Sequence, residues 1–137
     1  MLLDVDSGQV THRSGNTVHL GDATAHAEMN LLREAARSEV ALTRSVVVTT
    51  AEPCPMCAAA AVFSRVAGIA YGMPAARLSK YGWLRFDVSL TALLDGVVSR
   101  ALTRPSVAGG VLTVECLELF RQRPRCDDGP GARGAGG

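Results

Sequence analysis

The chain has 137 residues, of which 47% are hydrophobic, and its formal net charge is +1. This length predicts a single domain with one core, and the balanced charge excludes a broad positive field of the kind that attracts nucleic acid. No apolar stretch is long enough for a membrane span, and the N-terminus lacks the features of a secretory signal. We therefore expect a cytoplasmic protein with reduced cysteines and no membrane partner.

The first half of the chain predicts two strands, a helix and a third strand. Short apolar segments at 2–5 and 10–13 flank a turn of Asp, Ser and Gly, which is typical of a hairpin. Thr24 is a candidate cap for a helix over 25–37, where apolar residues recur at helical spacing. The β-branched segment 45–50 predicts a central strand that is covered on both faces.

The second half continues the alternation of helices and strands. The sequence predicts a helix over 56–65, a strand over 67–72 and a terminal helix over 111–123. Between them, 89–102 fits either a short helix or a helix that leads into a strand. This alternation predicts an α/β sheet with helices on both faces.

These elements define one domain over residues 1–123. The remaining segment, 124–137, is rich in glycine and has almost nothing to bury, so we expect a disordered tail. The chain opens directly on a predicted strand, with no preceding helix to cover one face of the sheet.

Four residues stand out as candidates for chemistry. His26 and Glu28 are two residues apart, Cys54 and Cys57 are three apart, and each pair lies near the start of a predicted helix. A lone Cys-x-x-Cys pair also fits a redox site or half of a structural zinc site. Taken together, one imidazole and two thiolates suit zinc, and three protein ligands leave the fourth position open, as in catalytic sites. Glu28 is then free to act as a base.

The segments "HAE" and "PCPMC" match the H-x-E…P-C-x-x-C signature of zinc deaminases. Over 2–123 the chain resembles the cytidine and deoxycytidylate deaminase superfamily, in the branch of guanine, cytosine, nucleoside and tRNA adenosine deaminases. The resemblance is strongest in "GDATAHAEMNLLREAA" and "VVVTTAEPCPMCAAAA". It implies a three-layer α/β/α sandwich around a five-stranded mixed sheet. The family's usual N-terminal helix is missing, which implies a truncated start, a partner that covers the exposed face, or a compromised protein.

The resemblance also implies roles for the four residues. His26, Cys54 and Cys57 would bind Zn²⁺, and Glu28 would pass a proton from the zinc-bound water to a ring nitrogen. Hydroxide would add at the amino-bearing carbon, and the amine would leave as ammonia.

Three further residues are candidates for substrate binding. The resemblance implies that Asn16 hydrogen-bonds the base, because members of this branch have an asparagine with that role at about this place. An asparagine beside a glycine is equally typical of a turn. Ala27 would leave room for a flat ring, and Pro53 would lie beside it. Downstream, three aromatic residues could form a lid over a base, but we favour a core position for them under a loop. They are Tyr81, Trp83 and Phe86.

Of the properties considered, the substrate is the one that the sequence specifies least. We favour a free nucleobase or nucleoside, such as guanine or cytosine, because the chain has near-zero charge and a single lysine, Lys80. A tRNA adenosine deaminase is the alternative, supported by the likeness of "AAAAVFSRVAGIAYG" and "LFRQRPR" to that branch. A second alternative is a truncated, inactive zinc-binding member of the fold. The resemblance also implies a homodimer.

Overall fold

The computed structural model describes residues 1–81, 83, 86, 88–98 and 101–122. The predicted disordered tail, 124–137, lies outside these residues. One five-stranded sheet has the order β2-β1-β3-β4-β5. The strands are β1 (Leu2–Asp4), β2 (Val10–His12), β3 (Ser45–Ala51), β4 (Gly68–Met73) and β5 (Ser106–Gly109).

The sheet is mixed, as the resemblance implies. β1 pairs antiparallel with both β2 and β3, whereas β3, β4 and β5 run parallel. The parallel strands need crossover connections, and helices supply them. The helices are α1 (Ala27–Arg37), α2 (Pro55–Phe63), α3 (Ala75–Ser79), α4 (Leu90–Asp95) and α5 (Thr113–Arg121), with short turns η1 (Val18–Leu20) and η2 (Leu42–Arg44).

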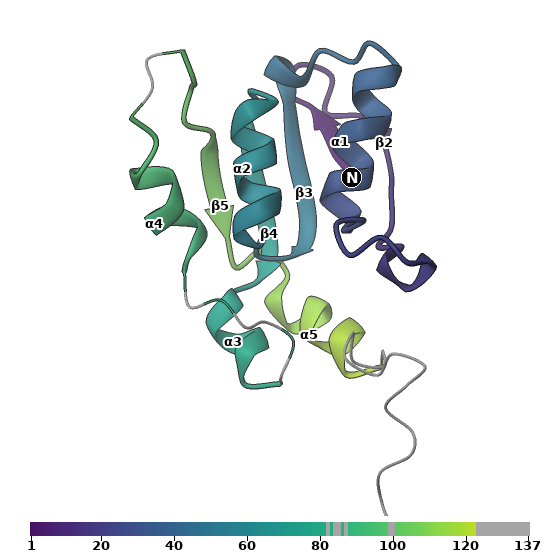
Figure 1. Cartoon of the computed structure of the whole chain (residues 1–137), viewed down its shortest axis with the longest axis vertical. Helices are drawn as coiled ribbons and strands as arrows, with labels where there is room; N and C mark the ends of the chain where they lie inside the picture. Colours follow the sequence, from purple (N-terminus) through teal and green to yellow (C-terminus); the bar gives the residue numbers. More distant parts are fainter. Residues whose placement is uncertain (82, 84–85, 87, 99–100, 123–137) are drawn as a thin grey trace, which may run out of the picture.

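The hydrophobic core lies between the sheet and the helices α1, α2 and α4. Figure 1 shows α1 and α2 in front of the sheet, running roughly along its strands. Because side chains alternate along a strand, one face of the sheet supplies buried residues to this core, namely Leu2, Val47 and Ile69. The helices supply, among others, Leu31, Leu32, Ala58, Ala61, Leu90 and Leu94.

The opposite face of the sheet carries the third layer. α5 packs against β4 there, with the Thr113 hydroxyl donating to the Gly72 carbonyl at 3.0 Å. A Cβ at Gly72 would collide with the side chain of Cys116, so this close approach requires glycine. The sandwich predicted from the resemblance is therefore confirmed.

Three predicted helix boundaries are wrong by about two residues, one of them the end of the second helix, which lies at Phe63 and not at residue 65. The first helix begins at Ala27 because His26 has extended backbone angles, and the Thr24 hydroxyl donates to Asp22 instead of capping the helix. The last helix begins at Thr113 because Leu112 lies in the left-handed region, with φ of 51°. Of the two options for 89–102, the short helix is correct, since β5 begins only at Ser106.

Within the described part of the chain, no helix is both long enough and apolar enough to span a membrane.

Candidate functional site

The candidate site lies where α1 and α2 begin. His26 is the N-cap residue of α1, Cys54 is the N-cap residue of α2, and Cys57 follows in the first turn of α2. The two helices lie side by side with their first turns at the same end, beyond the carboxyl end of β3 (Figure 1). Ligand sites of open α/β sheets are found at this edge, and helix N-termini there favour negative charge.

The three predicted ligands lie close together. The Nδ1 atom of His26 is 3.6 Å from the Sγ atom of Cys54 and 3.6 Å from the Sγ atom of Cys57. A tetrahedral zinc ion with its usual bond lengths would separate a nitrogen ligand from a sulfur ligand by about 3.6 Å. The donor atoms and both nitrogen–sulfur distances therefore fit zinc, and the three residues could hold such an ion.

The pKa values of the two thiols in this cluster are shifted in opposite directions. The hydrogen bond with Cys57, together with the one to His26, lowers the pKa of the Cys54 thiol to about 4. The same contact with Cys54, reinforced by burial, raises the pKa of Cys57. The bond to Cys54 also raises the pKa of His26. One thiolate therefore forms readily, which prepares the cluster for a cation.

Glu28 lies beside these ligands, in the first turn of α1. After the contact with Cys54 and burial, the Glu28 carboxylate is a further cause of the raised pKa of the Cys57 thiol. The Thr49 hydroxyl, on β3, donates a hydrogen bond to Oε1 of Glu28 at 2.6 Å. Sequence reasoning missed Thr49, although a hydroxyl at the end of an apolar strand was a usable signal.

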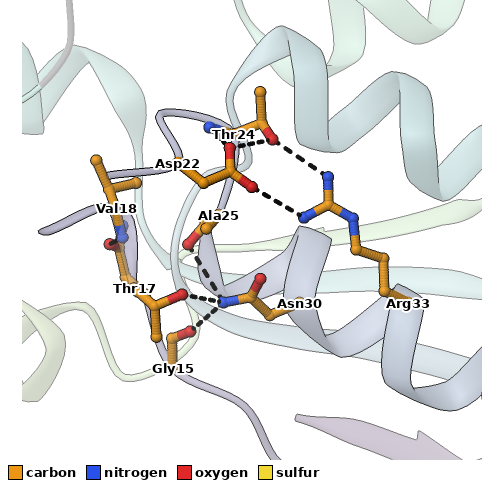
Figure 2. A network of polar contacts seen from close by, with 9 residues as sticks. Gly15, Thr17, Val18, Asp22, Thr24, Ala25, Asn30 and Arg33 are labelled. Atoms are coloured by element: carbon orange, nitrogen blue, oxygen red, sulfur yellow. Dashed lines mark hydrogen bonds and ion pairs between the residues drawn. The ribbon is translucent and has the colours of Figure 1, made fainter. Parts of the chain in front are cut away.

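The loop before His26 is tied to α1 by one amide group (Figure 2). The Nδ2 atom of Asn30 lies 3.0 Å from the carbonyl of Gly15, 2.8 Å from the hydroxyl of Thr17 and 3.3 Å from the carbonyl of Ala25. The backbone N–H of Thr17 also donates to Ala25. These contacts fix the loop on either side of η1 and lead directly to His26.

A second, more exposed contact joins the same loop to α1. Arg33 donates to the Thr24 hydroxyl at 3.2 Å and pairs with Asp22 at 3.7 Å (Figure 2). Hydrogen bonds from Thr24 lower the pKa of Asp22. Because both charged side chains are exposed, we expect this ion pair to contribute less than the Asn30 contacts.

Two of the three predicted substrate-binding residues adjoin the cluster in the chain, since Ala27 follows His26 and Pro53 precedes Cys54. Ala27 is the first residue of α1 and is half-buried, and Pro53 is buried directly before Cys54. Asn16 is exposed, and its Oδ1 atom accepts a hydrogen bond from the N–H of Val18 at 3.0 Å. This contact agrees with the turn interpretation of Asn16. Base binding by these residues stays a prediction.

The three aromatic residues do not behave alike. Trp83 packs edge-on against Phe120 of α5, with ring centroids 5.4 Å apart and an interplanar angle of 75°. Phe86 is 61% exposed, and Tyr81 is 38% exposed. The core interpretation is therefore wrong for Phe86 and Tyr81, whereas Trp83 is half-buried and packs against α5.

Comparison with known proteins identifies relatives along most of the chain. A tRNA-specific adenosine deaminase of Agrobacterium fabrum is 46% identical over 127 residues, which cover 88% of this chain and 78% of the relative. A tRNA(Ile)-lysidine synthase of Deinococcus radiodurans is 37% identical over 125 residues, which cover 89% of this chain. A chloroplastic tRNA(adenine(34)) deaminase of Arabidopsis thaliana is 33% identical over 133 residues, covering 86% of this chain. The chain spans only 20% and 10% of these last two proteins.

Solved structures share the fold. One from a study of A-to-I editing by tRNA:A34 deaminases has a TM-score of 0.64 and 29% identity, and the match covers 86% of this chain and 82% of that one. A guanine deaminase from Nitrosomonas europaea has a TM-score of 0.71 at 24% identity, covering 88% of this chain and 69% of that one, which is a likeness of fold alone.

A family match coincides with the site. Residues 2–73, which include all three candidate ligands and Glu28, match the family described as the cytidine and deoxycytidylate deaminase zinc-binding region. That family binds zinc, as the donor set predicts. The chain therefore belongs to the cytidine and deoxycytidylate deaminase family.

Proposed function

We propose that the protein is a zinc-dependent hydrolytic deaminase that removes the amino group of a nucleobase, with His26, Cys54 and Cys57 as the zinc ligands and Glu28 as the proton shuttle. The observation that carries this proposal is the equal 3.6 Å spacing from His26 Nδ1 to the two sulfurs. Three ligands leave a fourth position for water, as hydrolytic zinc sites require.

Zinc in such a site supplies a Lewis acid that lowers the pKa of water and so provides a nucleophile at neutral pH. Glu28 accepts the proton that the water loses and delivers it to a ring nitrogen of the base. Glu28 then helps to protonate the amino group, which leaves as ammonia while the ring carbon becomes a carbonyl. Thr49 holds the Glu28 carboxylate in one orientation throughout.

For the substrate, we propose an adenosine within tRNA. The support is the Agrobacterium fabrum relative, a tRNA-specific adenosine deaminase whose similarity covers most of both chains. The solved tRNA:A34 deaminase structure supports the same class. These similarities favour tRNA over the free nucleobase or nucleoside that the sequence analysis preferred.

A free nucleobase or nucleoside is the second candidate. The observation that favours it is the net charge of +1, since a protein that grips an RNA stem usually has a basic face. The inactive alternative loses support because all four chemical residues lie together.

A homodimer and a cytoplasmic location stay predictions. Light scattering after size-exclusion chromatography tests whether the protein is a dimer.

The deciding experiment measures ammonia release by the zinc-loaded protein. The substrates are a tRNA anticodon stem-loop, guanine, cytosine, adenine and their nucleosides. We expect inosine in the RNA and no release from the small molecules. Release from a base or nucleoside alone would replace the tRNA proposal with the second candidate, and silence on every substrate would contradict the deaminase proposal.

Two variants test the roles of the residues. Glu28→Ala should keep one zinc per chain and lose at least about a hundredfold in turnover, because a positioned acid–base group contributes that much. Glu34→Gln, an exposed carboxylate change on the same helix, is the matched control and should keep full activity. Cys57→Ser should lose zinc. Retention of zinc by that variant would contradict the ligand assignment.

A further inference from the structure

One buried carboxylate beside the site has no role in the proposed chemistry. Glu52 lies between β3 and α2, and only 6% of it is exposed. Burial of a carboxylate is unfavourable unless hydrogen bonds replace its water. The side chain therefore needs hydrogen-bond partners inside the protein.

The contacts of Glu52 join three separate segments. Its Oε2 atom accepts the backbone N–H of Ala75 at 2.8 Å, and its Oε1 atom accepts that of Leu90 at 2.6 Å. Its own N–H donates to the carbonyl of Met73 at 2.8 Å. Both oxygens of the side chain thus act as acceptors, which is the hydrogen-bonding pattern of a carboxylate.

These contacts lie at both ends of a single segment. Ala75 begins α3 and Leu90 begins α4, so the carboxylate holds the two ends of segment 75–90. This segment leaves the carboxyl end of β4, at the edge of the sheet where the candidate site lies (Figure 1). Cys54 follows Glu52 by two residues.

We infer that Glu52 is a positioning residue that fixes both ends of segment 75–90 against the turn that carries Cys54. The segment contains Tyr81 and Trp83, so the carboxylate sets where these side chains lie relative to the site. The consequence for substrate binding rests on the proposed function, whereas the anchoring of the segment does not.

Glu52→Gln tests the inference. The amide keeps the size of the side chain but replaces one acceptor by an NH₂ group, which would face a backbone N–H. We expect the amide hydrogens of Ala75 and Leu90 to exchange at least about tenfold faster, with exchange in α1 unchanged, because only a local contact is lost. We also expect the KM to rise several-fold with kcat and the zinc content retained.

A second variant removes a donor instead of the acceptor. Ala75→Pro deletes the N–H that Oε2 accepts, and proline is tolerated at the first position of a helix. The preceding residue, Pro74, already has a ψ of 143°, as a residue before proline prefers. This variant should raise the KM as Glu52→Gln does, which keeps the inference testable if Glu52→Gln does not fold.

Several outcomes would overturn the inference. Equal acceleration of exchange in every element of Glu52→Gln would mean that Glu52 supports only global stability. Unchanged exchange at Ala75 and Leu90 would mean that the contacts do not hold the segment. Unchanged KM in Ala75→Pro would remove the link to substrate binding. If the protein deaminates none of the substrates, the exchange measurements still decide whether Glu52 anchors the segment.

Discussion

The Thr49 hydroxyl donates a hydrogen bond of 2.6 Å to Oε1 of Glu28, the proposed proton shuttle. This bond comes from a partly buried hydroxyl and is charge-assisted, so its removal should cost more than an average hydrogen bond. We expect Thr49→Val to lower kcat by about tenfold, with KM and zinc content nearly unchanged, because Glu28 loses its fixed orientation. Steady-state kinetics with metal analysis check this result.

Thr49→Ser provides the matched control. Serine keeps the hydroxyl and loses the methyl group, whereas valine keeps the shape and loses the hydroxyl. If the hydrogen bond matters, serine should restore kcat. If Thr49 acts only by packing in β3, valine should be fully active and serine should be impaired, and that pattern would refute the positioning role.

At the scale of elements, the loop before α1 depends on the amide of Asn30. Asn30→Ala removes the donor to Gly15, Thr17 and Ala25, and we expect a loss of about 1–2 kcal/mol in the free energy of unfolding. Asn30→Asp should cost more, because a carboxylate oxygen would face the carbonyl oxygens of Gly15 and Ala25, which cannot donate a hydrogen bond. Urea unfolding monitored by circular dichroism measures both.

Arg33→Ala is the comparison variant, because it removes the second, more exposed contact between the same loop and α1. Its ion pair with Asp22 is exposed on both sides, with side-chain exposures of 42% and 56%. We expect a change below about 0.5 kcal/mol. A larger loss for Arg33→Ala than for Asn30→Ala would mean that the outer contact, and not the amide, holds the loop.

At the scale of the whole molecule, the near-neutral net charge predicts how strongly tRNA binding depends on salt concentration. Proteins that bind nucleic acid through many phosphate contacts lose about a thousandfold or more in affinity between 50 and 200 mM salt. With a net charge of +1, this chain should lose only about tenfold or less. Measuring the KM for the stem-loop at both salt concentrations tests this expectation. A steep dependence would reveal a basic face that the net charge conceals.

The sequence alone was enough to predict the chemistry of the candidate site. The residue types of His26, Glu28, Cys54 and Cys57 and their short spacings already predict zinc with a neighbouring base, because ligand preference is a property of the side chain. Alternating apolar segments likewise predicted the order of strands and helices as far as β4, whereas α3 and β5 were not predicted from them. Such local patterns need no knowledge of distant contacts.

Tertiary structure decided the parts that depend on distant residues. Thr49 meets Glu28 only because β3 lies beside α1, and Glu52 reaches Ala75 and Leu90 only after the parallel strands align. Phe86 is exposed although its residue type favours burial. Hydrogen bonds between segments far apart in the chain depend on packing, and no local spacing encodes them.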